Sequence, residues 1–120
     1  MSPPRLRTKR IYAPAERDDG QRVLIMRLWP RGIRKDRVDV WLKELGPVTP
    51  LLRDFLDRRV GWGGYVGRYL AGLERPDAQA HVAEVLAYAR RGPVTLLCGC
   101  ADENRCHRTL LKAYLAGRLL

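Results

Sequence analysis

A short segment near the C terminus holds the side chains best suited to chemistry: Cys98, Cys100, Cys106, His107 and Arg108. Cys98 and Cys100 are two positions apart, so they share one face if a strand continues past residue 99. Cys106 is expected in the first turn of a helix, where the helix dipole and Arg105 or Arg108 favour a thiolate. His107 is placed to accept its proton, so Cys106 and His107 are predicted catalytic residues. Cys98 or Cys100, also predicted at the catalytic site, would resolve an oxidised Cys106.

Two other roles remain open for these cysteines. Three thiolates and one imidazole are a ligand set that zinc favours, but C-x-C followed by adjacent Cys106 and His107 departs from the usual zinc-binding spacings. Adjacent residues of one helix also converge poorly on a single ion. No metal or other cofactor is therefore assigned, and zinc stays an alternative. The third interpretation is an inert cluster, because free cysteine is among the most buried residue types.

A second group of distinctive side chains follows an apolar run earlier in the chain. It consists of Arg27, Trp29 and Arg31. An arginine presents a planar, permanently charged fork that suits carboxylate or phosphate oxygens. We predict that these three residues, together with Arg108, bind an anionic substrate. The structural alternative is that Arg27 pairs with a nearby acidic residue and that Arg31 is solvated.

Two strongly apolar segments must position these groups. Residues 22–28 and 93–98 are predicted as buried strands, and residues 8–12 as a short edge strand. About 65 residues of mainly helical pattern separate the two buried strands, and a crossover of that kind usually makes strands parallel. Ligands of open α/β sheets bind beyond the carboxyl ends of the strands. We therefore expect the arginines and the thiols to meet at one edge of the sheet.

The remaining pattern is helical and completes a small α/β domain. The first expected helix is capped by Asp36, carries Trp41 among its apolar positions and is closed by Gly46-Pro47. The others begin at Thr49, Tyr65 and Pro76 and after the turn at residues 99–104. The predicted fold is a single α/β domain, three-layer-like, with a short mixed or parallel sheet flanked by helices.

Length and composition limit the protein to a few classes. The 120 residues suit one domain, predicted over residues 8–120 after a basic N-terminal arm over residues 1–7. The longest apolar runs are far shorter than the ~20 residues of a membrane span. The first ten residues do not resemble a secretory signal, and three cysteines are too few for a disulfide scaffold. We therefore expect reduced thiols and a cytoplasmic location.

The charge of the chain favours anionic partners. Lysine and arginine number 23 against 13 acidic residues, giving a formal net charge of +10. Such an excess attracts nucleic acid, nucleotides or other phosphorylated molecules. The sequence contains no zinc-finger, RNA-recognition or helix-turn-helix signature. The expected partner is an anionic small molecule or nucleic acid, and no membrane.

Several motifs resemble one known family. They are Arg10-Ile-Tyr, Asp19-Gly20-x-Arg22, Arg27-Leu-Trp-Pro-Arg-Gly32 and Trp41-Leu-Lys43-Glu-Leu-Gly-Pro47. Together they resemble the DUF488 family, particularly its short YeaO-like members. The Cys106-His107-Arg108 motif is similar to a Cys-His-Arg motif in longer branches of that family. The resemblance implies an α/β fold and an activity that is uncharacterised.

The sequence thus predicts a small enzyme that acts on a phosphate-bearing or nucleotide-like substrate. An arginine-lined pocket next to the Cys-His-Arg motif would bind that substrate. Two other functions stay open. One is a non-catalytic module that binds nucleic acid through its basic surface, and the other is a domain stabilised by zinc.

Overall fold

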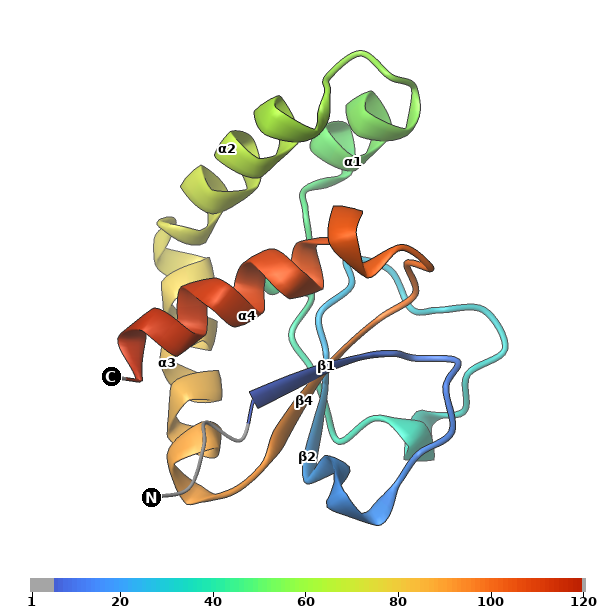
Figure 1. The fold of residues 1–120 in the computed structure, drawn as a ribbon, viewed down its shortest axis with the longest axis vertical. Helices are drawn as coiled ribbons and strands as arrows, with labels where there is room; N and C mark the ends of the chain where they lie inside the picture. The colour runs from blue at the N-terminus through green and yellow to red at the C-terminus, as the bar shows by residue number, and fades with distance from the viewer. Residues whose placement is uncertain (1–5, 120) are drawn as a thin grey trace.

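The computed structural model describes residues 6–119, which fold into a four-stranded parallel sheet and four α-helices (Figure 1). The predicted small α/β domain is therefore confirmed. Of the basic arm predicted over residues 1–7, positions 1–5 lie outside the described residues, and Leu6 and Arg7 belong to the first strand. Within residues 6–119, every helix is too short or too polar to cross a membrane.

The sheet has the strand order β1-β4-β2-β3, and every neighbouring pair is parallel. The strands are β1 (Leu6–Arg10), β2 (Gln21–Leu24), β3 (Val40–Trp41) and β4 (Val94–Cys98). β2 and β4 come from the two apolar segments and are parallel neighbours, as predicted. β1 is an edge strand, also as predicted, and begins two residues earlier than expected. β2 ends at Leu24, although the apolar run continues to residue 28. The last hydrogen bond to β4 is from the N–H of Ile25 to Leu97 O (3.0 Å), and the chain then leaves the sheet.

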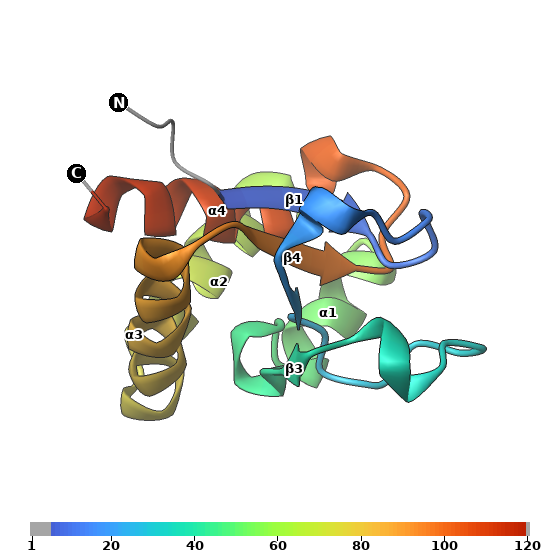
Figure 2. The same ribbon diagram turned by 90° about the horizontal axis from the view of Figure 1, so that it is seen from below.

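The helices cover one face of this sheet. They are α1 (Thr49–Leu56), α2 (Trp62–Leu73), α3 (Pro76–Arg91) and α4 (His107–Arg118). Val23 and Leu96 point to this face and pack in one core with buried residues of all four helices. Leu24 and Leu97 point to the opposite face, because side chains alternate along a strand. Loops and 3-10 turns of residues 11–38 cover that second face, to the right of the strands in Figure 2.

The helix predicted from Asp36 is wrong. Its place is taken by β3 and by two 3-10 turns, Lys35–Arg37 and Lys43–Leu45. The open edge of β2 explains the difference, because the N–H of Leu42 donates to Leu24 O (2.9 Å) and the segment pairs with the sheet. Trp41 consequently lies 41% exposed at the sheet edge and not in a helix core.

A buried carboxylate connects the strands at the amino end of the sheet. Asp19 is 1% exposed and accepts from Lys9 Nζ (2.9 Å), from the guanidinium of Arg22 and from the N–H of Glu16 (3.0 Å). Its own carbonyl accepts from Thr95 Oγ1 (2.7 Å). Burial alone would raise the pKa of Asp19, but these donors outweigh it and hold the pKa below its ordinary value.

We predict that Asp19→Asn destabilises the fold by about 3–5 kcal/mol at neutral pH, because it leaves two cations without their shared carboxylate. The pKa of Asp19 is lower in the folded protein than in the unfolded chain. Its stabilisation is therefore present above about pH 4 and is lost as the pH falls through the folded pKa. Urea denaturation at neutral and acidic pH measures this effect.

Asp18→Asn is the matched control, because the side chain of Asp18 is 73% exposed and pairs only loosely with Arg7 (3.5 Å). An exposed pair contributes about 1 kcal/mol or less. Equal losses for the two variants at neutral pH would contradict the role given to Asp19.

Candidate functional site

The segment that holds the three cysteines begins at the carboxyl end of β4. Because β4 and β2 are parallel, this is also the edge of the sheet where β2 ends. Cys98 is the last residue of β4, and Cys100 lies in the turn that follows. The 3-10 turn Glu103–Arg105 then reverses the chain, with the Asp102 side chain accepting from the N–H of Asn104 (3.0 Å). α4 begins directly after this turn, so its N terminus returns to the end of the strand.

All three sulfurs and the His107 imidazole converge at this point. Cys98 Sγ lies 3.5 Å from Cys100 Sγ and 3.4 Å from Cys106 Sγ. His107 Nδ1 lies 3.8 Å from the Cys98 sulfur and 3.9 Å from that of Cys106. The four atoms are all within 4.8 Å of one another. We call these four residues the Cys-His cluster.

The backbone at Cys106 differs from the expectation and explains the convergence. Cys106 was expected in the first helical turn, but it is the N-cap of α4, with extended backbone angles (φ −134°, ψ 142°). His107 is the first helical residue. With this backbone, the Cys106 sulfur and His107 Nδ1 lie 3.9 Å apart. The objection that neighbouring residues of one helix cannot converge therefore does not apply.

The His107 ring is fixed by its other nitrogen. Nε2 lies 2.5 Å from the carbonyl oxygen of Ile25, the residue after β2, so Nε2 carries a proton and donates a hydrogen bond to that oxygen. Nδ1 therefore faces the sulfurs. The ring packs edge-on against Tyr69, with 5.5 Å between the ring centroids. Imidazole orientation and tautomer are thus both set by the fold.

Proton affinities within the Cys-His cluster are strongly perturbed. Hydrogen bonds from Cys100 and Cys98 lower the pKa of Cys106 far below that of an ordinary thiol. Hydrogen bonds with Cys100 and Cys106, together with burial, raise the pKa of Cys98. Burial opposes the protonation of His107, but its contacts with Cys100, Cys106 and the Ile25 carbonyl raise its pKa to about 9. Contacts among these side chains thus shift the pKa of Cys106 downward and the pKa of His107 upward.

Arg108 supports the cluster from the other side. Its Nη1 donates to the carbonyl oxygen of Cys100 (2.7 Å), which holds the turn after β4. The residue is only 4% exposed. Sequence reasoning predicted Arg108 as a substrate-binding residue, but its observed partner is the backbone of this turn.

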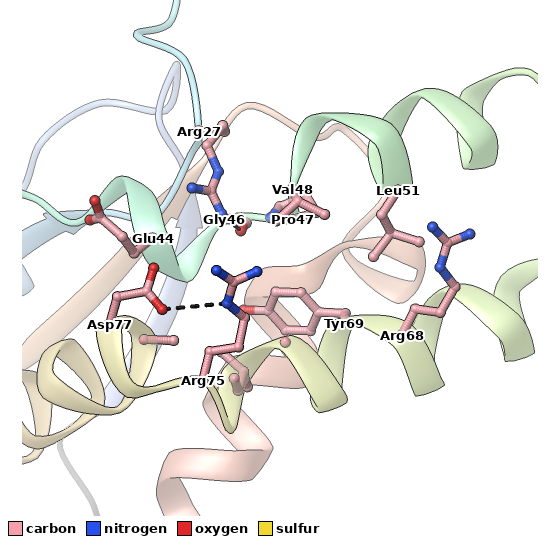
Figure 3. Close-up of a pocket in the computed structure, with 13 residues that line it drawn as sticks. Arg27, Glu44, Gly46, Pro47, Val48, Leu51, Arg68, Tyr69, Arg75 and Asp77 are labelled. Atoms are coloured by element: carbon pink, nitrogen blue, oxygen red, sulfur yellow. Dashed lines mark hydrogen bonds and ion pairs between the residues drawn. The ribbon is translucent and has the colours of Figure 1, made fainter.

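Arg27 lines a cavity on the helical face of the sheet and follows two residues after Ile25, whose carbonyl contacts His107. Its Nη2 donates to the carbonyl oxygen of Gly46 (3.0 Å). The cavity has a volume of about 80 Å³. Figure 3 shows the guanidinium groups of Arg27 and Arg75 directed toward each other beside Tyr69. The other charged residues of the lining are Glu44, Arg68 and Asp77.

Most of these charges already have partners. Arg68 pairs with Asp54 (3.2 Å) and Arg75 loosely with Asp77 (3.6 Å). Glu44 contacts His81 Nε2 (3.1 Å). Arg27 differs, because no carboxylate in the described part of the chain lies within ion-pair distance of it.

Tyr69 connects the cavity with the Cys-His cluster. Its ring contacts His107 and lines the cavity, and its hydroxyl donates to Leu45 O (2.7 Å). Burial raises the pKa of Tyr69 well above that of an ordinary phenol, so the hydroxyl stays protonated. Sequence reasoning expected a helix over residues 65–73 but missed Tyr69. The four-residue spacing of Tyr65, Tyr69 and Leu73 was the available signal for this buried face.

The structure does not bring Trp29 and Arg31 to this cavity. Trp29 packs on the opposite face of the sheet, where its Nε1 donates to Ile33 O (2.9 Å) and its ring lies against Trp41 (5.4 Å). Arg31 is exposed, and its carbonyl accepts from Tyr12 (3.1 Å). The chain crosses to the loop-covered face after Arg27, which separates the three residues predicted to act together.

Comparison with known proteins places the chain in a family. The sequence model described as "Active DUF488-N3 subclade" matches residues 6–119. The chain belongs to the DUF488 family. Within it, the chain is 35% identical over 113 residues to the uncharacterized protein YeaO of Escherichia coli K12, covering 92% of this chain and 96% of that protein.

Two mycobacterial relatives give the same result. The chain is 34% identical over 116 residues to the uncharacterized proteins Mb3100c of Mycobacterium bovis and Rv3073c of Mycobacterium tuberculosis H37Rv. Each match covers 95% of this chain and 96% of the relative. No solved structure matches the chain. The resemblance found in the sequence is thus confirmed at the level of the family.

Gly46 allows the close approach that positions Arg27. A Cβ at this position would lie 2.7 Å from the backbone nitrogen of Arg27 and 3.1 Å from the carbonyl oxygen of Ile25. We predict that Gly46→Ala destabilises the protein by about 1–3 kcal/mol, because backbone atoms at the end of β2 must move. Thermal unfolding measures this loss.

Gly67→Ala serves as the control, because a Cβ at this exposed position in α2 meets no atom within 4 Å. It is expected to stabilise the helix by about 0.5–1 kcal/mol. If Gly46→Ala were as stable as the wild type, the close approach at Arg27 would have no structural importance.

Proposed function

We propose that this protein binds a small phosphate-bearing substrate in the Arg27 cavity. The observation that carries the proposal is the arrangement of Arg27 and Arg75, whose guanidinium groups face each other across the cavity (Figure 3). Two like charges directed at one space favour an anion between them. The bidentate fork of arginine matches the geometry of phosphate oxygens.

Arg27 is the central residue of the proposed site. It is half-buried, and its Nε is buried without a hydrogen-bond partner among the described residues. An arginine of this kind keeps its charge and has donors to spare, so an incoming anion replaces little existing bonding. Arg75 has a side chain that is 66% exposed, and it is held only loosely by Asp77. It can therefore adjust to the ligand.

The size and charge of the cavity limit the ligand. About 80 Å³ is far below the roughly 300–1,000 Å³ of pockets that enclose a drug-sized molecule. The cavity therefore suits a single phosphoryl group, with the rest of a nucleotide-like ligand lying outside. Of the three arginines that line it, Arg68 pairs with Asp54 and Arg75 with Asp77, so Arg27 is the cation left to bind an anion. The carboxylates that line the cavity would accept hydrogen bonds from hydroxyl groups of the ligand.

Turnover of this ligand by Cys106 and His107 stays a prediction from the sequence. The residues that line the Arg27 cavity include none of the three cysteines, and Cys106 is 1% exposed. Tyr69 lies between the two parts of the site. Ligand binding is therefore the part of the predicted enzyme function that this geometry supports.

The test is calorimetric titration of the protein with inorganic phosphate and with ribose 5-phosphate. Arg27→Met and Arg75→Met should each weaken binding about 10–100-fold, since a hydrogen bond to a charged group contributes about 1.5–3 kcal/mol. Arg31→Met is the control, because it removes the same charge from a distant exposed position. Equal weakening by all three substitutions would contradict the cavity as the binding site.

The basic surface favours one other function, the binding of nucleic acid. The formal net charge of +10 supports it. Binding of that kind would fall steeply with salt and would respond to Arg31→Met as much as to Arg27→Met. Titration of an oligonucleotide at two salt concentrations, with both variants, distinguishes this function from the cavity proposal.

A further inference from the structure

We propose that Cys98, Cys100, Cys106 and His107 bind one zinc ion as a four-coordinate structural centre. The inference is independent of the anion-binding proposal, because none of these residues lines the Arg27 cavity. The centre would join the end of β4 to the start of α4 and, through His107, to the end of β2.

The spacing of the ligand atoms fits a tetrahedral ion. With Zn–S bonds of about 2.3 Å and Zn–N bonds of about 2.0–2.1 Å, tetrahedral geometry places sulfurs about 3.8 Å apart and sulfur about 3.6 Å from nitrogen. The observed sulfur–sulfur distances are 3.5 and 3.4 Å, and the sulfur–nitrogen distances are 3.8 and 3.9 Å. All four ligand atoms lie within 4.8 Å of one another, so shifts of about 1 Å or less bring them around one ion.

The donor set and its support also fit zinc. Three sulfurs and one imidazole nitrogen form a Cys₃His set, which is typical of structural zinc sites. His107 offers Nδ1, while Nε2 donates to Ile25 O (2.5 Å). Metal-bound histidines almost always donate their other ring N–H to a carbonyl or carboxylate in this way. The carbonyl of Cys100 is held in turn by Arg108 (2.7 Å).

The positive charge next to the Cys-His cluster would balance the negative charge of a bound zinc centre. Zinc with three thiolates and a neutral imidazole carries one net negative charge. Arg108 is buried next to this site, its Nε has no hydrogen-bond partner, and no carboxylate among residues 6–119 pairs with it. An unpaired buried cation is costly, so an anionic metal centre beside it offsets that cost. The N terminus of α4 adds positive dipole character at Cys106.

Burial points to a structural role and not a catalytic one. Cys98 and Cys106 are 1% exposed and His107 is 4% exposed, while Cys100 is half-buried. Four protein ligands leave no open position for water or substrate, unlike catalytic zinc sites, which have three. The exposed turn of residues 101–105 lies between the ligands, so metal binding would fix its two ends.

The test begins with the metal content of the full-length protein, purified with reductant and without chelator. We expect about one zinc per chain and, after exchange with Co²⁺, the visible bands of tetrahedral cobalt with thiolate-to-cobalt charge transfer. The thiols should react slowly with a thiol reagent until a strong chelator is added. The chelator should also lower the unfolding temperature.

His107→Ala and Cys100→Ser test the ligands individually. Mutation of a residue that only hydrogen-bonds to a metal ligand weakens metal affinity about 10–100-fold. Removal of a ligand itself should therefore weaken zinc affinity more than about 100-fold. Competition with a chromophoric chelator measures this affinity. His81→Ala is the matched control, because His81 is the chain's other histidine and lies on α3 between Glu44 and Glu84. It should retain the wild-type zinc content.

Cys100 is the least buried ligand, so Cys100→Ser is the variant expected to disturb folding least. Circular dichroism monitors the fold of each variant. Three results would overturn the proposal. The first is reduced wild-type protein that binds no zinc when zinc is supplied. The second is a cobalt spectrum without thiolate charge transfer. The third is equal zinc affinity in the His107→Ala, Cys100→Ser and His81→Ala variants.

Discussion

The backbone ladder between β2 and β4 is the constraint on which the rest of this structure depends. At its carboxyl end, the peptide groups of Ile25 are used twice. The N–H of Ile25 donates to Leu97, and its carbonyl accepts from His107 Nε2. The first bond aligns the two strand ends, and the second fixes the imidazole that faces the sulfurs. Because these bonds share one residue, the position of α4 is tied directly to the register of the sheet.

The two chemical parts of the site are adjacent but distinct. The Cys-His cluster is closed and buried, and its four ligand atoms are directed at one another. The Arg27 cavity lies on the helical face of the sheet and is lined by charged side chains, among which Arg27 has no carboxylate partner within residues 6–119. Tyr69 is their common wall. A zinc ion in the Cys-His cluster would therefore also fix Tyr69, which contacts His107 and lines the Arg27 cavity.

Membership of the DUF488 family gives the chain relatives over almost its whole length. The motifs that carried the resemblance have structural explanations here. Asp19 and Arg22 form the buried ion pair at the amino end of the sheet. Gly46 allows the backbone to approach Arg27, and its carbonyl binds that guanidinium. Arg31, within the Arg27–Gly32 motif, is exposed.

The sequence by itself determined the α/β class, the parallel pairing of β2 with β4 and the helices from Thr49, Pro76 and the region after residue 104. Apolar periodicity, proline and capping residues act over a few positions, so they can be read locally. The tertiary structure decided the rest. The open edge of β2 converted the expected helix at Asp36 into β3, and the crossing of the chain after Arg27 removed Arg31 from the site. The extended backbone of Cys106 placed its sulfur close to the His107 ring. Each of these depends on hydrogen bonds or packing between segments far apart in the chain, which no local pattern records.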